Sequence, residues 1–343
     1  MNPDFIIVTG GDAGYFDLIH ELLLSIRRLP EGADAPLGVI DAGLTEAQIK
    51  QLKALGASVV RPDWPYAVAE RRARGRTFLK ANLGKAFLDQ YFPDHTVIVW
   101  LDGDTWVQTW DAIPLFLAGA ARGKLAIVSQ ASRYQREHMA LKWRFLGLAE
   151  PRTILYKNAR RARLNSALAR SLATKPVLNA GAFALRRDAP HWGVWRRRQQ
   201  EVLSHGRLFT SDQLALALAV YIDGLPYEAL PEWCNYMGPY RWDSSRRLFV
   251  EYFLPFYPVS IMHLAGRDDM RRDSTIKVEI ADLEDRTIRL PLRFSAWHDE
   301  AGLSVAARSA VPSPAAAIAP DIGNVHSGFV QPATHSPGFQ TCP

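Results

Sequence analysis

The sequence predicts an α/β fold in which helices flank a mostly parallel β-sheet. Short apolar runs rich in β-branched residues alternate with longer segments whose apolar residues recur at helical spacing, and this alternation persists over roughly the first 130 residues. Polar or glycine-rich residues follow two of the apolar runs, at Gly10-Gly11-Asp12 and at Asp102. Ligands of such sheets bind beyond the carboxyl ends of the strands, so both positions are candidate functional sites.

Strands and helices alternate regularly through the first half of the chain. The predicted strands are residues 5–9, 37–41, 58–60, 96–102 and 124–129. The predicted helices are residues 15–29, a helix that opens at Thr45, residues 78–92 and a helix that begins near Asp111. Gln48 follows Thr45 by three residues, which is the pattern of a helix-opening capping box.

The second half is less regular and ends in a segment of different composition. We expect a basic, helix-prone stretch at 157–175, a strand at 177–188, helices at 190–204 and 211–224, and a short strand at 260–266. Residues 276–280 and 287–294 are expected to pair as a small C-terminal β-hairpin. Residues 301–343 are rich in alanine, serine and proline and nearly uncharged, so we expect a disordered tail after one domain spanning 1–300.

The composition is that of an ordinary globular protein with an excess of positive charge. The chain has 343 residues, of which 48% are hydrophobic and 22% charged, and its formal net charge is +6. This charge suits a phosphate-bearing ligand or an anionic surface without deciding between them. Cys234 and Cys342 have the spacing of neither a disulfide framework nor a zinc site. We expect no signal peptide, no membrane span, no nucleic-acid partner and a cytoplasmic location, with peripheral membrane contact left open.

The most informative stretch is VIVWLDGDTWV, residues 97–107, in which an apolar strand is followed by Asp102 and Asp104. Three interpretations compete. Two carboxylates one residue apart can hold a hard divalent cation such as Mn²⁺ or Mg²⁺. The same spacing opens the active site of haloacid-dehalogenase-type phosphatases, in which the first aspartate attacks phosphorus. The third interpretation is a turn or a helix cap that binds no ligand.

Four further blocks accompany this one. In chain order the five are IIVTGGDAGYFDLIHELLLSI (6–26), TFLKANLGKAFLDQYFPDHTVIVWLDGDTWV (77–107), Asn179-Ala180-Gly181, Ser211-Asp212-Gln213 and His263-Leu264-Ala265-Gly266. Together they resemble the nucleotide-diphospho-sugar transferases of the GT-A fold, most closely glycosyltransferase family 8. Each block is short, but their order is specific and covers residues 5 to 267. The resemblance implies a nucleotide-binding half at about residues 1–130 and an acceptor-side half at about 131–300.

The resemblance also implies roles for individual residues. The residues that it places in the nucleoside pocket or on the donor are Thr9, Asp12, Tyr15, Lys80, Asp102, Gly181, Gly266 and Arg267. The residues that it places on the metal ion, Mn²⁺ or Mg²⁺, are Asp102, Asp104 and His263. The residues that it places near the transferred sugar are Asn179, Gly181, Asp212 and Gln213. Asn179 is expected to fix the sugar hydroxyls, and Asp212 or Gln213 to stabilise the positive charge that develops on the sugar.

The chain departs from the family pattern after Gly266. The family continues to a Lys-Pro-Trp, which is missing here, so Arg267 is the candidate for its diphosphate-binding role. Leu214 stands where the family often carries another aspartate. The resemblance implies transfer of a sugar from a nucleoside diphosphate sugar, in particular a UDP-sugar, to an unknown saccharide, lipid or protein acceptor, with retention of configuration.

Several alternatives stay open at this point. A phosphohydrolase could recruit Ser129, Lys175 and the pair Asp268-Asp269, and a nucleotide-sugar-binding protein would need no turnover at all. Asp212 could serve only as a helix N-cap, a role that Ser211 could fill equally well. Lys85 and the cluster Arg71, Arg72, Arg74 and Arg76 are further candidate phosphate partners, although such arginine runs are more often solvated surface.

Overall fold

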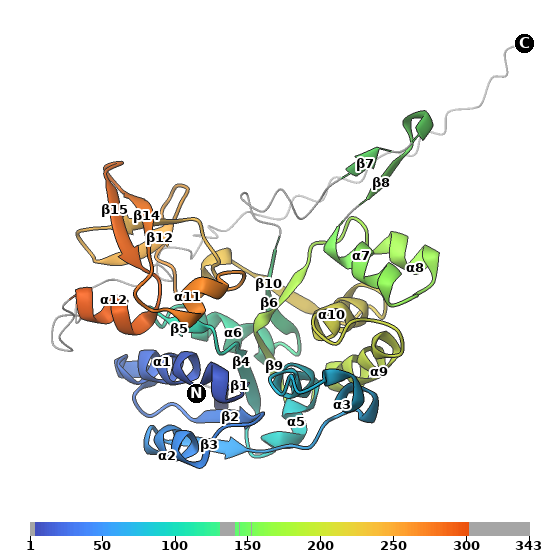
Figure 1. Ribbon diagram of the computed structural model, residues 1–343, viewed down its shortest axis with the longest axis horizontal. Helices are drawn as coiled ribbons and strands as arrows, with labels where there is room; N and C mark the ends of the chain where they lie inside the picture. Colours follow the sequence, from blue (N-terminus) through green and yellow to red (C-terminus); the bar gives the residue numbers. More distant parts are fainter. Residues whose placement is uncertain (1–3, 131–140, 144, 152, 302–343) are drawn as a thin grey trace, which may run out of the picture. The chain divides into compact units, whose positions relative to one another are not determined.

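A seven-stranded β-sheet forms the centre of the computed structural model, with the strand order β10-β6-β9-β4-β1-β2-β3 (Figure 1). In this order the strands are β10 (Tyr227–Leu230), β6 (Leu125–Ser129), β9 (Leu178–Arg186), β4 (Val97–Leu101), β1 (Phe5–Gly11), β2 (Leu37–Asp41) and β3 (Ala57–Val60). The structure describes residues 4–130, 141–143, 145–151 and 153–301, which lie in one compact unit. Apart from Ala301, the predicted tail lies outside the described residues.

The strands run in one direction with a single exception, β9, which is antiparallel to both β4 and β6. β1 pairs in parallel with β2 and β4, β2 with β3, and β6 with β10. The predicted mostly parallel sheet is confirmed. Because β9 runs the opposite way, it begins at the edge where the other strands end. The residues after β1 and β4 and those at the start of β9 therefore meet at one edge of the sheet, where ligands bind in folds of this class.

Helices cover both faces of the sheet. Every residue of β4 is buried, with Ile98 and Trp100 in the core on one face and Val97, Val99 and Leu101 in the core on the other. The helices contributing to the first core include α4 (Leu79–Gly84), α7 (Ile154–Arg161), α9 (His191–Leu203) and α10 (Ser211–Tyr221), and those contributing to the second are α1 (Phe16–Arg27), α2 (Glu46–Ala54) and α6 (Ala112–Ala121). Burial on both sides explains why the strands read as continuous apolar runs.

The helix predictions are confirmed in part. The capping box at α2 is present, because the Gln48 amide donates to Thr45 Oγ1 and the Thr45 amide donates to Gln48 Oε1. The single helix predicted over 78–92 is wrong, since this segment forms α4, a 3₁₀ turn at Lys85–Phe87 and α5 (Leu88–Tyr91). The Lys85 side chain is buried at the break, where it meets two carboxylates. Helix propensity cannot anticipate such a tertiary contact.

The basic stretch at 157–175 forms parts of two helices, α7 and α8 (Ser166–Ser171). Arg163, between them, has a left-handed φ of 58°, and Asn165 caps α8 through its side chain. Just before α7, strands β7 (Leu141–Trp143) and β8 (Ala149–Pro151) pair as a two-stranded sheet that was not predicted. Other elements that were not predicted include α3 (Ala67–Ala73) and the 3₁₀ turns Ala13–Tyr15, Pro30–Gly32, Phe145–Gly147 and Glu232–Cys234.

A smaller sheet contains the predicted C-terminal hairpin. Its strands, in order, are β12 (Leu248–Glu251), β11 (Tyr240–Asp243), β14 (Lys277–Asp282) and β15 (Thr287–Pro291), followed along the chain by α12 (Phe294–Ala301). β14 and β15 are antiparallel with Ile280 opposite Ile288, which confirms the hairpin, whereas β11 and β12 were not predicted. Within the described residues, no helix has the length and apolar character needed to cross a membrane.

Candidate functional site

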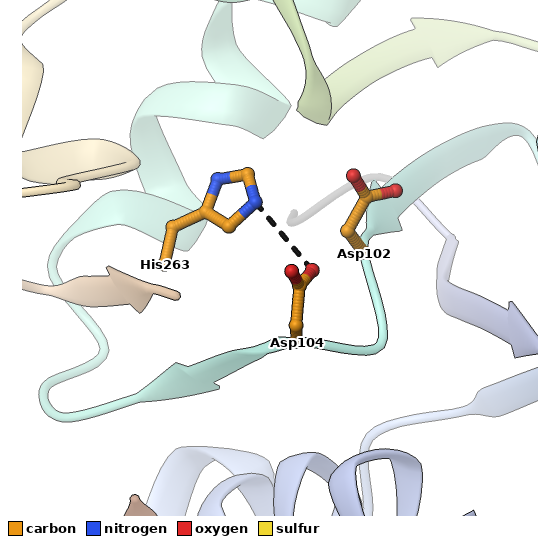
Figure 2. A group of neighbouring side chains, drawn as sticks. All are labelled: Asp102, Asp104 and His263. Carbon is orange, nitrogen blue, oxygen red and sulfur yellow. Dashed lines mark ion pairs between the residues drawn. The ribbon is translucent and has the colours of Figure 1, made fainter. Parts of the chain in front are cut away.

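Two aspartates and a histidine converge just beyond the end of β4. Asp102 and Asp104 flank the turn between β4 and β5 (Thr105–Val107), and His263 ends β13 (Ile261–His263). β13 pairs antiparallel with β5, and this register sets His263 opposite Thr105, next to Asp104. One ligand atom from each of the three residues lies within 4.8 Å of the other two, and Figure 2 shows the imidazole directed at the Asp104 carboxylate. The structure therefore brings together the three residues predicted to bind a metal ion.

The histidine is oriented by a residue that the sequence analysis did not identify. His263 Nδ1 lies 2.8 Å from Asn235 Oδ1, and an amide oxygen can only accept a hydrogen bond. Nδ1 is therefore the donor in this contact, and Nε2 faces the carboxylates, 3.5 Å from Asp104 Oδ1. Asn235 is 3% exposed and acts here as the second partner that metal-binding histidines usually have.

These donors fit a divalent cation. Carboxylate oxygens suit Mn²⁺ or Mg²⁺, and a neutral imidazole nitrogen is a common additional ligand of transition metals. The distance of 3.5 Å between His263 Nε2 and Asp104 Oδ1 is compatible with both atoms binding one ion at about 2.1 Å each. Because the three residues leave further coordination positions open, phosphate oxygens or water could complete the shell.

Arg271 is a further residue of the site that was not predicted. It lies on α11 (Asp268–Arg272), and its Nη1 donates to Asp104 Oδ2 at 2.7 Å. Burial alone would raise the pKa of Asp104, but the nearby His263 and Arg271 lower it below its ordinary value, so the carboxylate stays ionised. Arg271 occupies Oδ2 only, whereas Oδ1 faces His263.

Lys85 joins the metal-site aspartate to the predicted catalytic aspartate. Its Nζ is fully buried and lies 2.7 Å from Asp102 Oδ1 and 3.3 Å from Asp212 Oδ2. It also donates to the Ala180 carbonyl at 3.1 Å. Burial would lower the pKa of this ammonium, but the two carboxylates raise it, so Lys85 remains charged. The two carboxylates and the carbonyl hold the Lys85 ammonium here, and its suggested phosphate contact stays a prediction.

Gly181 lies in the middle of the cluster. Its carbonyl accepts the Asp102 amide at 2.7 Å, and its amide donates to Asn179 Oδ1 at 3.0 Å. A Cβ at this position would lie 2.4 Å from His263 Cε1 and 3.0 Å from both Asp102 Oδ2 and Asn179 Oδ1. Only glycine allows β9 to pass this close to the metal-site side chains.

Asp212 and Gln213 open α10 on the other side of Lys85. The N-cap position belongs to Thr210, which has a left-handed φ of 73° and makes no capping side-chain bond. The suggestion that Asp212 or Ser211 caps the helix is therefore wrong. Asp212 is buried and faces Lys85, and Gln213 Nε2 donates to the Leu178 carbonyl at 3.1 Å.

The residues predicted for the nucleoside pocket lie around the end of β1. Asp12 accepts hydrogen bonds from the Gly14 amide, from Thr77 Oγ1 and from the Phe78 amide, which joins the first loop to α4. Tyr15 stacks on Phe78 with ring centroids 6.1 Å apart. Burial raises the pKa of Tyr15, and the charges of Arg271 and Asp104 also act on it, so its phenol is close to the metal site. Thr9 is buried on the same strand, with no hydrogen-bond partner for Oγ1 among the described residues.

The other predicted donor residues are Lys80, Gly266 and Arg267. Within the described residues, the Lys80 and Arg267 side chains form no hydrogen bond or ion pair with Asp102, Asp104 or His263. The Lys80 ammonium is 5.8 Å from the Trp64 ring, and the Arg267 guanidinium is 5.8 Å from the Tyr240 ring. Gly266 has a φ of 74°, a value that glycine adopts without strain. Their donor roles stay predictions, and Arg271 is the arginine of this segment that contacts Asp104.

The phosphohydrolase interpretation finds no support in this geometry. The lysine beside Asp102 is Lys85, whereas the Lys175 ammonium lies 5.7 Å from the Tyr221 ring. Asp268 pairs with Arg271 and is largely exposed. A pocket beside Asn235 is lined by Ser129, Gln130, Asn179 and Glu232 among others, so Ser129 lies on the side of the site that carries Asn179.

Sequence reasoning missed Arg271 and Asn235 and did not predict the carboxylate partners of Lys85, and the three residues left unequal signals. Lys85 lies within the matching block and could have been recognised as a buried cation from its apolar neighbours Leu83, Ala86 and Leu88. Arg271 lies eight residues after His263, in the segment where the family pattern is interrupted. Asn235 lies in no recognised motif, and its role depends wholly on the tertiary fold.

Three solved glycosyltransferase structures are similar to this chain at low sequence identity. It matches the galactosyltransferase LgtC in complex with donor and acceptor sugar analogues at a TM-score of 0.47 and 15% identity, over 76% of this chain and 87% of that one. It matches mouse xyloside xylosyltransferase 1 at 0.45 and 14%, over 77% and 98% of the two chains. It matches GlyE of Streptococcus pneumoniae TIGR4 at 0.48 and 13%, over 89% and 62%. The matches include family-8 and other GT-A glycosyltransferases. No family profile and no curated protein matches the sequence.

Proposed function

We propose that this chain is a metal-dependent glycosyltransferase that takes a sugar from a nucleoside diphosphate sugar, in particular a UDP-sugar. The observation that carries the proposal is the convergence of Asp102, Asp104 and His263 within 4.8 Å at the carboxyl edge of the sheet. The proposed ligand is Mn²⁺ or Mg²⁺, and the proposed acceptor is a hydroxyl group of a saccharide, a lipid or a protein.

The chemistry needs positive charge where the diphosphate leaves. A divalent ion held by the three residues would neutralise the charge that develops on the departing diphosphate. Arg271 pairs with Asp104, so it is placed to add a second positive charge. Its bond to Asp104 Oδ2 leaves Oδ1 available for the ion, and its guanidinium could also reach an oxygen of the diphosphate.

The sugar side of the site is formed by β9 and α10. Asn179 is proposed to bind sugar hydroxyls, and Asp212 or Gln213 to stabilise the positive charge on the sugar as the bond to the diphosphate breaks. Lys85 is proposed as a positioning residue, because it fixes Asp212 relative to Asp102. We propose that the anomeric configuration is retained, and NMR of the anomeric proton in the first product formed distinguishes retention from inversion.

The first test measures binding without requiring a known acceptor. Calorimetric titration of the full chain with UDP should give measurable affinity with Mn²⁺ and little or none in EDTA. Asp104→Asn should lose the metal-dependent affinity, because it removes one ligand charge. Asp94→Asn, which changes an exposed carboxylate elsewhere on the chain, should titrate like the natural protein. Equal affinity for UDP in Mn²⁺ and in EDTA would contradict the metal role.

The second test separates an enzyme from a binding protein. The chain is incubated with Mn²⁺ and a panel of UDP-sugars, with and without mixed saccharide acceptors, and the released UDP is measured. Turnover should depend on Asp104, whereas metal-dependent binding without any release of UDP would favour the binding protein. Release of phosphate from generic phosphate esters would instead favour the phosphohydrolase.

A further inference from the structure

Large apolar side chains are exposed on one short hairpin. The eight large hydrophobic residues exposed in the described part of the chain include four within residues 141–148. These four are Leu141, Trp143, Phe145 and Leu148, with exposed fractions of 61%, 71%, 88% and 67%. Soluble proteins rarely gather such residues at the surface without a partner, and tryptophan and phenylalanine are the side chains that favour a membrane–water interface.

The helices that follow the hairpin carry the excess positive charge of the chain. Residues 153–175 contain six lysines and arginines and no aspartate or glutamate, and the whole chain has a net charge of +6, so the remaining residues are neutral in sum. The six are Lys157, Arg160, Arg161, Arg163, Arg170 and Lys175, and all are exposed. Within the residues that the structure describes, none of the six is ion-paired with an acidic side chain.

The opposite side of α7 is anchored in the protein. Leu155 and Ala159 are buried in the main core, and Asn158 donates to Thr210 Oγ1 at the start of α10. α7 is therefore amphipathic: its apolar side packs against the core, and its basic side is exposed to solvent. The chain leaves the main sheet after Ser129, at the end of β6, and returns to it at Leu178, at the start of β9. Ser129 pairs with Leu178, the neighbour of Asn179, so the chain leaves and rejoins the sheet beside the candidate site.

We propose that the four exposed apolar residues of the hairpin, Leu141, Trp143, Phe145 and Leu148, and the basic sides of α7 and α8 form a surface that binds an anionic lipid bilayer. The apolar side chains of the hairpin would enter the interface between headgroups and acyl chains, and the arginines and lysines would contact lipid phosphates. The bilayer is favoured over a polyanion such as a nucleic acid because phosphate contacts alone give no role to four exposed apolar side chains.

The proposal predicts that binding depends on both lipid charge and apolar insertion. The full chain should co-sediment with vesicles that contain about 30% phosphatidylglycerol in phosphatidylcholine, and at least about tenfold more weakly with phosphatidylcholine alone. Raising the salt to about 0.5 M should weaken binding to the anionic vesicles, because it screens the phosphate contacts.

Two pairs of substitutions test the two parts of the surface separately. Trp143→Ser with Phe145→Ser should reduce vesicle binding about tenfold or more, and Leu254→Ser, at a site 72% exposed outside the surface, should not change it. Arg160→Glu with Arg161→Glu should also reduce binding at least about tenfold, whereas Arg187→Glu, an exposed arginine after β9, should have a smaller effect. All four sites of the test variants are exposed, so thermal melting should confirm that these variants fold.

The same experiments can overturn the proposal. Equal binding to neutral and anionic vesicles, or unchanged binding by both double variants, would show that this surface does not bind the bilayer. If DNA or dextran sulfate competes fully and Trp143→Ser with Phe145→Ser binds vesicles normally, the surface binds polyanions instead. Quenching of tryptophan fluorescence by brominated lipid gives an independent readout, and it should fall in Trp143→Phe if Trp143 enters the bilayer.

Discussion

Gly181 is the residue at which the candidate site is most crowded, and its effect can be isolated. In Gly181→Ala the new methyl group would contact only side chains of the site among its nearest atoms, led by His263 Cε1 at 2.4 Å. We expect metal-dependent UDP binding to fall at least about tenfold, because His263 or Asp102 must move from its position. Calorimetry with Mn²⁺ measures this loss.

The matched control is Gly193→Ala. Gly193 lies within α9, and a Cβ there meets nothing within 4 Å. Alanine should stabilise the helix by about 0.5–1 kcal/mol and leave UDP binding unchanged. If Gly181→Ala also keeps its UDP affinity, the metal-site side chains do not occupy the positions described here when the ligand binds.

Asn235 offers a residue-scale test of how the histidine is positioned. Asn235→Leu keeps the side-chain volume but removes the acceptor for the His263 Nδ1 proton. We expect the affinity for Mn²⁺ to fall about 10- to 100-fold, as for other partners of metal-binding histidines. Asn235→Asp retains an acceptor oxygen and should keep most of the affinity. Equal metal affinity in all three proteins, measured by titration with Mn²⁺, would show that Asn235 is not a positioning residue.

Asp41 shows at the scale of an element how a strand is joined to the loop after it. As the last residue of β2, it accepts the amides of Gly43 and Leu44 at 2.8 and 2.6 Å and pairs with Arg61. Burial would raise its pKa, but the amides and Arg61 lower it below the ordinary value. A carboxyl group with a lowered folded-state pKa stabilises the protein above its unfolded-state pKa, and this stability is lost as the pH falls through the folded value.

Asp41→Asn should therefore lower the free energy of unfolding at pH 7 by about 1–2 kcal/mol. The difference from the natural protein should shrink as the pH falls from about 5 towards 3, because the unfolded natural chain then binds a proton at Asp41 that the folded carboxylate, with its lowered pKa, does not yet bind. Urea denaturation of both proteins across this range measures the effect. A difference that stays constant with pH would mean that the charge of Asp41 is not what stabilises the turn.

The elements differ in how far their sequence determines them. β1, β2 and β4 were predictable because burial on both faces makes them continuous apolar runs, and α2 was predictable because Thr45 and Gln48 cap it locally. The break at Lys85 and the strands β11 and β12 were not, since they depend on contacts between segments distant in the chain. The candidate site divides in the same way. Asp102, Asp104 and His263 lie in motifs, whereas Asn235 and Arg271 reach the site only through the fold.

At the scale of the whole molecule, the site is assembled from segments that are far apart in the chain. The turn after β4 supplies the aspartates, β13 the histidine, β9 the glycine and asparagine, and α10 the carboxylate that meets Lys85. The single antiparallel strand makes this possible, because β9 begins where β4 ends. A ligand that contacts several of these segments must then stabilise the fold as a whole, since unfolding any one of them disrupts its site.

This coupling gives a prediction for thermal stability. With UDP and Mn²⁺ at about 100 times the dissociation constant, binding should add about 2.7 kcal/mol to the free energy of unfolding and raise the Tm by several degrees. EDTA should abolish the shift, and Asp104→Asn should lack it because the ion loses a ligand. Asp94→Asn should shift like the natural protein, since its exposed carboxylate is no part of the site. Scanning calorimetry measures all four conditions. An equal shift with UDP in EDTA would mean that nucleotide binds without metal, and a shift retained in Asp104→Asn would mean that the ion lies elsewhere.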